Sequence, residues 1–557
     1  MADQNAVREE EEIIFRSPFP AVLVPENISL PEFVLRTDWK ENEKFRNNVA
    51  LVEASTGKEY TYDQVFSLTK KVAAGLVQTV GVLKGDVVLV VLPNMAEYPI
   101  IVLGIMLAGA VFSGSNPAAH VTEIEKQVRD SGAKFLVTVS SVFDKLCNLE
   151  FMASITVIMA DDHSKIEGKS VPLATLFETD DSVIELPVVG QNDLCALPYS
   201  SGTTGASKGV MLTHRNLIAN LCSTLFDVDE SLLGKFTTLG LMPFFHIYGI
   251  TGICCATLRN KGKVVVMSRF DLRLFMDVLI NCGVNFAPIV PPIMLALVKN
   301  PIVEEYDLSR LQLKAIMTAA APLAPDLQRA FHEKFPGVEV QEAYGLTEHS
   351  CITLTHCSPD NNIRGIAKKK SVGFILPNLE VKFVDPETGK SLPRNCQGEL
   401  CVRSQCVMQG YHQKPRETET TVDSQGWLHT GDVGFIDDDG DVFIVDRIKE
   451  LIKYKGFQVA PAELEAILLS HPSVDDAAVV PLADEEAGEI PAACVVKKAG
   501  GTESEDDMLK FVASQVASYK KVRVLHFVPS IPKSSSGKIL RRLVRDNLLN
   551  LTKAASN

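Results

Sequence analysis

The hydrophobic residues of this chain follow a pattern of short apolar runs alternating with helical segments. Runs rich in β-branched residues occur at residues 87–92, 134–139 and 263–267, and the last leads into a segment of helical periodicity at residues 271–282. Apolar runs of this length between helices are typical of buried parallel strands. We therefore expect layered α/β structure over most of the chain.

The pattern changes near residue 372. From there to about residue 445, strand-like segments are separated by turn-forming pairs such as Asp385-Pro386 and Asp439-Gly440, which predicts an antiparallel β region. A small α/β segment follows, with a helix at about residues 462–470 and strands near residues 477–480 and 492–496. The change from turn-separated strands to a small α/β segment predicts a domain boundary at residues 446–449.

Composition and charge narrow the class of protein. With 557 residues, 46% of them hydrophobic, the chain should fold into more than one domain. Its net charge of −14 argues against a nucleic-acid partner held by phosphate contacts. The polar N-terminus lacks a secretory signal, the C-terminus lacks the peroxisomal Ser-Lys-Leu, and the longest apolar stretch, residues 99–112, is short for a membrane span. We expect that stretch to be a buried helix and the protein to be cytoplasmic, with association at the endoplasmic-reticulum surface left open.

The most informative segment is residues 199–209, YSSGTTGASKG. Its glycines let backbone N–H groups approach phosphate oxygens, its hydroxyls add donors, and Lys208 supplies positive charge. The spacing is not that of a Walker A loop. A flexible linker is the alternative, but apolar runs at residues 194–197 and 210–212 flank the segment. The loop predicts a polyphosphate site formed by Ser200, Ser201, Gly202, Thr203, Thr204 and Lys208.

A second motif, residues 342–348 with the sequence EAYGLTE, joins an aromatic ring, a glycine, a hydroxyl and a carboxylate. These groups suit the stacking of a base, close approach to a phosphate and the binding of Mg²⁺. A simple strand-to-loop turn would explain Gly345, but not the Thr347-Glu348 pair that follows.

At these motifs the sequence resembles the adenylate-forming superfamily of acyl-CoA synthetases, firefly luciferase and peptide-synthetase adenylation domains. The resemblance extends from about Phe15 to Asp546. Within the superfamily the chain looks like the plant 4-coumarate-CoA ligase-like group, most closely its fatty-acyl-CoA synthetase branch associated with pollen-wall (sporopollenin) formation. The resemblance implies an acid–thiol ligase that uses ATP, Mg²⁺ and coenzyme A to convert a small-molecule carboxylic acid to acyl-AMP and then to acyl-CoA.

The same resemblance implies the architecture. The fold class expected is α/β, with a large N-terminal adenylation domain, residues 1–446, built from two α/β subdomains and a β-rich subdomain. A small mobile α+β C-terminal domain, residues 447–557, should complete the chain.

The resemblance also assigns the nucleotide site. It places Tyr344 on the adenine, Thr347 at the α-phosphate and Glu348 on Mg²⁺. Asp432, which follows Thr430-Gly431, and Arg447 would contact the ribose, although an Asp at such a place is often only a turn former. The other nucleotide-binding residues implied are Glu342, Ala343, Lys449 and Gln458.

Lysines of the small domain are assigned to catalysis. Lys538 ends the Ser/Gly-rich segment PKSSSGK, which could carry an ammonium group to a developing negative charge. The resemblance gives Lys538 to adenylation and Lys453 to thioester formation, with rotation about a hinge at Lys449 exchanging them. Coenzyme A would be held by Arg269, Lys455 and Gly456.

The acyl pocket differs from that of hydroxycinnamate ligases. By resemblance His246 is a gate near the carboxylate, although a buried core histidine is the alternative. The pocket residues implied are Tyr248, Gly252, Ala320 and His349. Glu342-Ala343 replaces Gln-Gly, Gly252 replaces a serine, and HSCI at residues 349–352 replaces Ala-Gly-Pro-Val. We therefore expect a medium- or long-chain fatty acid, or a hydroxy fatty acid, rather than 4-coumarate.

Other functions are alternatives to this hypothesis. A 4-coumarate (hydroxycinnamate)-CoA ligase would keep the chemistry and change the acid. Transfer to a carrier-protein thiol is disfavoured because no carrier domain follows Lys538. A catalytically inactive nucleotide-binding scaffold is disfavoured because every charged position expected for catalysis is filled.

Overall fold

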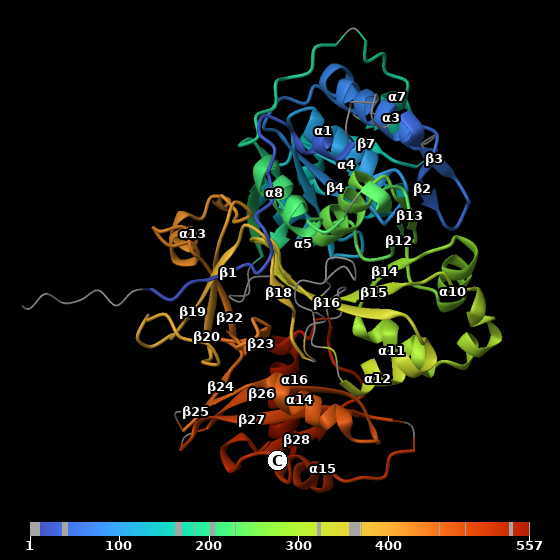
Figure 1. The fold of residues 1–557 in the computed structure, drawn as a ribbon. Coiled ribbons are helices and arrows are strands. Elements are labelled where there is room, and N and C mark those ends of the chain that lie inside the picture. The colour runs from blue at the N-terminus through green and yellow to red at the C-terminus, as the bar shows by residue number, and fades with distance from the viewer. Residues whose placement is uncertain are drawn as a thin grey trace, which may run out of the picture.

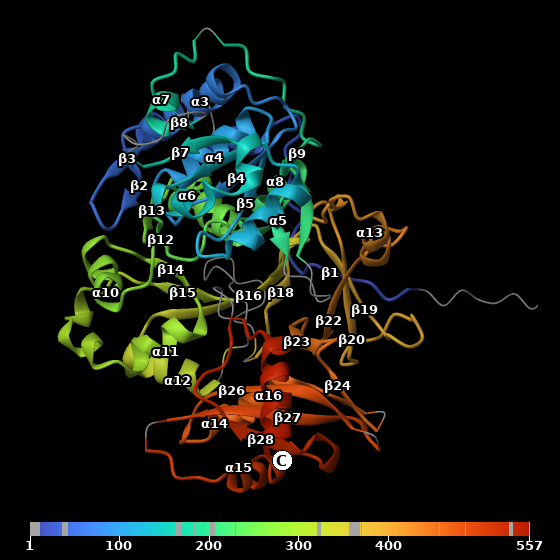
Figure 2. The ribbon, with the colours of Figure 1, turned by 180° about the vertical axis from the view of Figure 1, so that it is seen from behind.

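The computed structural model describes residues 12–35, 43–161, 170–182, 184–200, 207–228, 230–319, 323, 325–355, 368, 370–455, 457–484, 486–498, 500–533 and 538–555. These residues form four sheets (Figures 1 and 2). Two large mixed sheets lie in the N-terminal part, a smaller antiparallel sheet stands beside them, and the C-terminal residues, orange to red, form a fourth sheet at the bottom of both views. The α/β fold class predicted from the sequence is confirmed.

The first sheet has the strand order β10-β11-β9-β5-β4-β6-β7-β8, with β21 paired to β11. Its strands are β4 (Val87–Val91), β5 (Val111–Gly114), β6 (Phe135–Thr138), β7 (Thr156–Met159), β8 (Ser170–Pro172), β9 (Leu194–Ala196), β10 (Tyr199–Ser200), β11 (Lys208–Thr213) and β21 (Gly410–Tyr411). Its helices and helical turns are α3 (Tyr62–Gly75), η2 (Leu76–Val80), α4 (Tyr98–Leu107), α5 (Val121–Ser131), α6 (Ser140–Leu146), η3 (Glu150–Ser154), α7 (Leu173–Phe177) and α8 (His214–Thr224). The strands from β5 to β8 run parallel, as the apolar runs predict.

The second sheet has the order β18-β17-β16-β15-β14-β12-β13-β2-β3. Its strands are β2 (Val49–Glu53), β3 (Glu59–Thr61), β12 (Thr237–Gly240), β13 (Lys263–Val266), β14 (Phe286–Ile289), β15 (Ala315–Thr318), β16 (Glu339–Leu346), β17 (Ser350–Leu354) and β18 (Phe374–Ile375). The helical segments of this region and of the N-terminus are α1 (Leu30–Leu35), η1 (Glu43–Phe45), η4 (Glu230–Leu232), η5 (Tyr248–Cys255), α9 (Ala256–Arg259), α10 (Leu272–Asn281), α11 (Pro291–Lys299), η6 (Pro301–Glu305), η7 (Leu308–Arg310) and α12 (Pro325–Lys334).

Apart from β1, the strands of the third and fourth sheets come from the chain after residue 372, where the pattern of apolar runs changes. The antiparallel third sheet consists of β1 (Phe15–Arg16), β19 (Glu380–Val384), β20 (Gly398–Arg403), β22 (Leu428–Ile436) and β23 (Val442–Arg447), with α13 (Pro415–Thr421) nearby. The fourth contains β24 (Ile452–Tyr454), β25 (Phe457–Val459), β26 (Val474–Asp484), β27 (Gly488–Lys497) and β28 (Val524–Phe527), together with α14 (Pro461–Ser470), α15 (Glu505–Ala513), η9 (Ser518–Lys520) and α16 (Arg541–Ala555). The predicted helix near residues 462–470 and both predicted strands are confirmed.

Contrary to our expectation, the apolar stretch of residues 99–112 does not form a single helix. Helix α4 ends at Leu107 because Gly109 takes a left-handed φ of 73°, and the chain enters β5 at Val111. Both elements are buried in a core shared by the larger sheets. Among the described residues, no helix is both long and apolar enough to cross a bilayer.

The fourth sheet has hydrophobic clusters of its own. One includes Leu464 of α14 and Met508 of α15, and the other includes Val544 and Leu548 of α16. Residues 448–451 connect this sheet to β23. The position of α14 and α16 next to this connection brings the C-terminal segment against the third sheet and places Lys538 near β22.

Candidate active site

A large cavity of about 3040 Å³ lies among the four sheets. It is lined by residues that are distant in sequence, from the end of β10 to the start of α16. The predicted site residues found in its lining are Ser200, Lys208, His246, Tyr248, Gly252, Glu342, Ala343, Tyr344, Thr347, Glu348, Asp432, Arg447, Lys449 and Lys538. Folding therefore brings together most of the residues that the sequence motifs single out.

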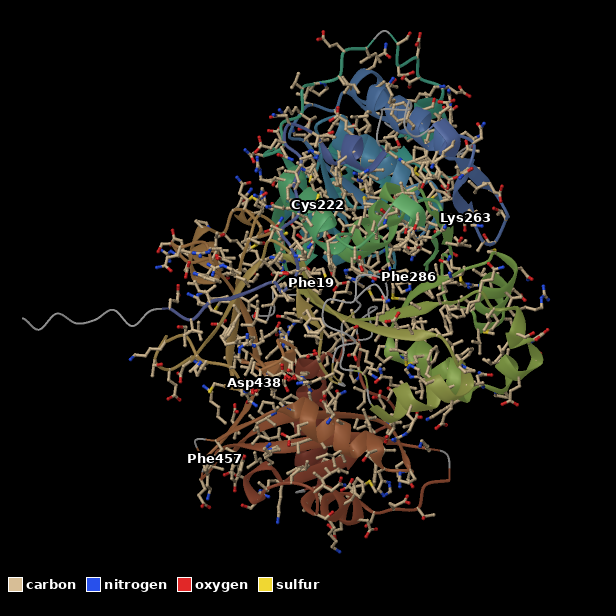
Figure 3. All side chains as sticks on the ribbon, viewed as in Figure 1. Phe19, Cys222, Lys263, Phe286, Asp438 and Phe457 are labelled. Carbon is tan, nitrogen blue, oxygen red and sulfur yellow. The ribbon has the colours of Figure 1, made fainter. Side chains whose placement is uncertain are left out.

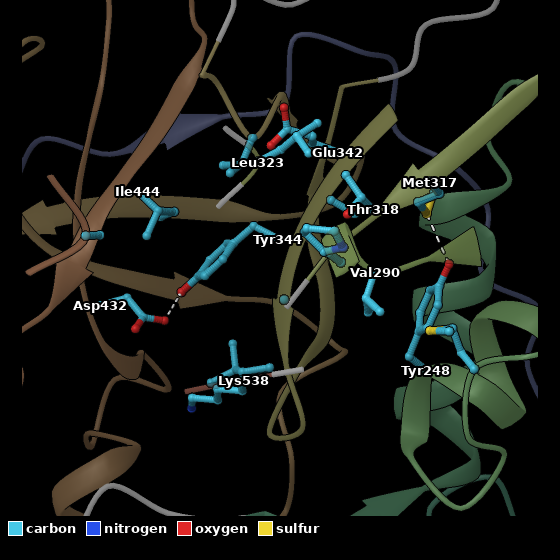
Figure 4. Close-up of a pocket in the computed structure, with 18 of the residues that line it drawn as sticks. Tyr248, Val290, Met317, Thr318, Leu323, Glu342, Tyr344, Asp432, Ile444 and Lys538 are labelled. Carbon is cyan, nitrogen blue, oxygen red and sulfur yellow. Dashed lines mark hydrogen bonds between the residues drawn. The ribbon is translucent and has the colours of Figure 1, made fainter. Parts of the chain in front are cut away.

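One end of the cavity is organised around Asp432. The phenol of Tyr344 on β16 donates a 2.6 Å hydrogen bond to Asp432 Oδ2 (Figure 4). Arg447 Nε lies 3.3 Å from Asp432 Oδ1. Asp432 and Arg447 are directly opposed residues of the antiparallel pair β22 and β23. Burial raises the pKa of Asp432, and the nearby Arg447 and Tyr344 partly offset that rise. A ring, a carboxylate and a guanidinium thus form one wall.

Lys538 lies beside this wall, as Figure 4 shows. The pKa of its ammonium group is lowered to about 8, mainly by burial and then by the neighbouring charge of Arg447, while Glu450 and Asp432 act in the opposite direction. A buried cation of this kind is suited to stabilise negative charge that develops on a reacting group. Lys538 is the one predicted catalytic lysine of the C-terminal segment that the described structure places in the cavity.

Glu348 is a candidate ligand for Mg²⁺. Its side chain is buried, and its Oε1 accepts a 2.8 Å hydrogen bond from the phenol of Tyr411. Carboxylate oxygen is the donor type that Mg²⁺ prefers, and one or two carboxylates usually suffice where substrate phosphates complete the coordination. The donor present therefore fits the ion. Tyr411 was not singled out from the sequence, because a Gly-Tyr pair in a β-rich region carries no local chemical signature.

The other end of the cavity is formed by the start of η5 and the edge of β15. The phenol of Tyr248 lies 3.2 Å from Met317 Sδ (Figure 4). A Cβ atom added to Gly252 would lie 2.6 Å from two ring atoms of Tyr248, so the ring packs directly on this glycine. Burial lowers the pKa of His246, whose Nε2 has no hydrogen-bond partner among the described residues. The imidazole is therefore neutral at pH 7.

Glu342 lies between these two ends. It is directly opposite Thr318 on the parallel pair β15 and β16, and Figure 4 shows both side chains at the cavity. Burial raises the pKa of Glu342 to about 7. Thr318 Oγ1 is buried without a hydrogen-bond partner among the described residues, so this hydroxyl remains available to a bound molecule.

Several predicted residues lie away from the cavity lining. Lys453 and Lys455 are exposed on the hairpin of β24 and β25, where Lys455 Nζ pairs with Glu486 at 2.6 Å. Phe457 of the same hairpin marks its place at the outer edge of the fourth sheet (Figure 3). Arg269 is exposed in the connection between β13 and α10.

His349 does not line the cavity, contrary to the expectation that it belongs to the acyl pocket. Its side chain is fully buried, and its Nε2 lies 2.7 Å from Ser404 Oγ. The neighbouring Glu348 and Ser350 both line the cavity, so the turn directs the histidine to the opposite side.

The remaining predictions lie outside the described residues. These are the loop residues Ser201, Gly202, Thr203 and Thr204, together with Ala320 and Gly456. The backbone of Gln458 lies in β25, but its side chain is not described.

Two family models match the chain. The model described as AMP-binding enzyme matches residues 39–412, and that described as AMP-binding enzyme C-terminal domain matches residues 463–538. The chain therefore belongs to the AMP-binding family of adenylate-forming enzymes, within its acid–thiol ligase class. Residues from both matched segments line the cavity.

The chain is similar to plant 4-coumarate–CoA ligase-like proteins over its full length. It is 63% identical to 4-coumarate–CoA ligase-like 1 of Arabidopsis thaliana over 552 residues, which cover 99% of this chain and 100% of that protein. It is 41% identical to 4-coumarate–CoA ligase 1 of Petroselinum crispum over 97% of this chain and 98% of that protein. Among solved structures, ATP-bound MatB from Rhodopseudomonas palustris has a TM-score of 0.82 at 26% identity, covering 93% of this chain and 99% of that one.

Proposed function

We propose that this protein is an ATP-dependent acyl-CoA synthetase that activates a medium- or long-chain fatty acid, including hydroxylated ones. ATP and the acid would form acyl-AMP and pyrophosphate, and coenzyme A would then replace AMP. The observation that carries the adenylation step is the grouping of Tyr344, Asp432 and Lys538, which are neighbours in the cavity although they come from three separate parts of the chain. The family membership of the chain supports the same chemistry.

In the first step a carboxylate oxygen of the acid attacks the α-phosphorus of ATP, and pyrophosphate leaves. The cations Lys208 and Lys538 would stabilise the charge on the phosphates, while Tyr344, Asp432 and Arg447 would hold the nucleoside. Glu348 would hold Mg²⁺, which neutralises phosphate charge when bound. The thioester step needs no protein nucleophile, because the thiol of coenzyme A attacks the acyl carbonyl directly.

We assign the two steps to two orientations of the small domain. Residues 1–446 would form the adenylation domain and residues 447–557 the rotating domain, with the hinge at Lys449. In the described orientation Lys538 lies in the cavity and Lys453 is exposed at the far hairpin. Rotation would bring Lys453 to the acyl-AMP. It would also bring the hairpin with Lys455 and Gly456 to coenzyme A, which Arg269 of the large domain would contact as well.

The shape of the acyl end supports a long substrate. Gly252, Ala256 and Asn260 are spaced about one helical turn apart along η5 and α9, and all three line the cavity. Eight residues of helix extend about 12 Å, so the cavity continues well beyond Tyr248. Two of these three residues are small, which leaves room for a flexible chain. The alternative acid is 4-coumarate, which is favoured by the names of the relatives.

The test is acid-dependent formation of AMP and acyl-CoA by the purified chain with ATP, Mg²⁺ and coenzyme A. The panel would contain saturated fatty acids of increasing length, their ω-hydroxy derivatives, and 4-coumarate. A higher kcat/KM for the aliphatic acids supports the proposal. A preference for 4-coumarate would leave the ligase chemistry intact and reject the substrate, whereas nucleotide binding without turnover of any acid would favour the inactive scaffold.

A further inference from the structure

Tyr411 contacts two of the proposed ligands of ATP and its metal ion at once. Its phenol oxygen lies 2.8 Å from Glu348 Oε1, and its ring centroid lies 4.7 Å from Lys208 Nζ. The first contact is a hydrogen bond to a carboxylate, and the second is a cation–π interaction. Tyr411 itself is only 7% exposed, so both contacts are made in a largely dehydrated environment.

The backbone holds this tyrosine against both partners. Strand β21 pairs with β11, with Tyr411 opposite Val210 and Gly410 opposite Met211. The amide of His412 donates to the carbonyl of Gly209 at 2.8 Å, and that of Met408 donates to the carbonyl of Glu348 at 2.9 Å. The segment around Tyr411 is therefore fastened on one side to the strand that carries Lys208 and on the other to the turn that carries Glu348.

We propose that Tyr411 is a positioning residue for adenylation, which orients Glu348 toward the divalent cation and holds Lys208 at the phosphates. This inference rests on the proposed function, since it takes the roles of Glu348 and Lys208 from it. One carboxylate oxygen of Glu348 accepts the hydrogen bond from the phenol. This bond restrains the rotamer of Glu348 and leaves the second carboxylate oxygen for a cation. Partners of this kind orient metal ligands in other proteins.

The phenol is a stable donor for this purpose. Burial and the adjacent charge of Glu348 both raise the pKa of Tyr411 above its usual range. A phenol is protonated at neutral pH, so Tyr411 is the donor and the carboxylate of Glu348 is the acceptor. The ring face offers Lys208 an electrostatic partner that does not neutralise its charge, so the ammonium group stays available for phosphate.

The variant Tyr411→Phe separates the two contacts, because it removes the hydrogen bond to Glu348 and keeps the ring beneath Lys208. The first measurement is binding of Mn²⁺, as a paramagnetic probe for Mg²⁺, to the full chain with the non-reacting nucleotide α,β-methylene-ATP, followed by electron paramagnetic resonance. We expect Tyr411→Phe to weaken Mn²⁺ binding about ten-fold. Tyr411→Leu removes the ring as well, and should also weaken metal-free binding of the nucleotide.

Two controls distinguish positioning from general destabilisation. Tyr60→Phe removes a comparable buried hydrogen bond, that of Tyr60 to Glu97 Oε1 at 2.5 Å, and neither residue lines the cavity. It should leave Mn²⁺ affinity unchanged even if it lowers the melting temperature. In a Glu348→Gln background, Tyr411→Phe should produce little further loss, because the residue acts through that carboxylate.

Wild-type Mn²⁺ affinity in a folded Tyr411→Phe variant would overturn the inference while leaving the proposed function intact. An equal loss in Tyr60→Phe would overturn it too, since a positioning effect must be specific to this site. If the wild-type chain binds no Mn²⁺ with the nucleotide, the proposed function and the inference fall together.

Discussion

The phenol of Tyr344 donates a 2.6 Å hydrogen bond to Asp432, although the two residues are 88 positions apart in the sequence. One comes from β16 of the second sheet and the other from β22 of the third. The bond fixes the ring that we expect to stack on adenine relative to the carboxylate that we expect to bind the ribose. The two halves of a nucleoside site are therefore coupled before a nucleotide binds.

This coupling predicts different effects for two substitutions of Tyr344. Tyr344→Phe keeps the stacking ring and loses the hydrogen bond to a buried carboxylate, so we expect KM for ATP to rise about three- to ten-fold with kcat little changed. Tyr344→Ala should raise KM further because the ring is lost. Steady-state AMP formation at saturating acid and coenzyme A measures both. A wild-type KM in Tyr344→Phe would show that the bond does not organise the site.

The positions of the two lysines predict a separation of the half-reactions. Lys538→Ala should abolish acid-dependent pyrophosphate release yet still convert supplied acyl-AMP to the thioester, because Lys538 would lie in the cavity only in the proposed adenylating orientation. Lys453→Ala should show the reverse. Each half-reaction is measured separately with purified variants. Equal loss of both half-reactions in both variants would exclude the proposed exchange of lysines.

The lowered pKa of Lys538 predicts the pH dependence of adenylation. The ammonium form is the one that stabilises negative charge, and its pKa is about 8. It is therefore fully protonated well below pH 8 and loses its charge as the pH rises through that value. We expect kcat/KM for ATP in adenylation to fall above pH 8, since this parameter reports the free enzyme.

Lys538→Arg provides the comparison, because a guanidinium stays protonated throughout this range. Its residual adenylation activity should lack the alkaline decline. In the wild type, the rate of the thioester step from supplied acyl-AMP should also show no alkaline decline. If kcat/KM for ATP declined with the same midpoint in Lys538→Arg, the titration would belong to another group.

The contact between Gly252 and Tyr248 predicts a change in acid preference. A Cβ at position 252 would lie 2.6 Å from the tyrosine ring, so Gly252→Ala must displace the ring toward the cavity or the neighbouring Met317. We expect kcat/KM for the longest acids to fall more than ten-fold and that for short acids to fall less. The same panel of acids measures this.

A double variant tests the cause. Tyr248→Leu removes the ring that would clash, so in that background Gly252→Ala should have little additional effect on long acids. If the losses from the two substitutions simply multiply, the glycine influences the channel by some route other than the position of Tyr248.

The sequence by itself determined the class of fold and indicated most of the candidate nucleotide site. Apolar runs and turn-forming pairs predicted the parallel and antiparallel regions, because strand formation and turn chemistry depend largely on neighbouring residues. Residues 199–209 and residues 342–348 could be recognised because each segment collects its ring, hydroxyl or charged groups in one contiguous stretch. Their chemistry was therefore visible before folding.

Only the tertiary structure decided which of these groups meet and which do not. It placed Tyr411 against Glu348, 63 positions away, and directed His349 to Ser404 instead of the cavity. It also showed Lys538 inside the cavity and Lys453 outside it. The physical reason is that contacts across sheets depend on strand register and on how the layers pack, and these are set by many distant residues together rather than by any one segment.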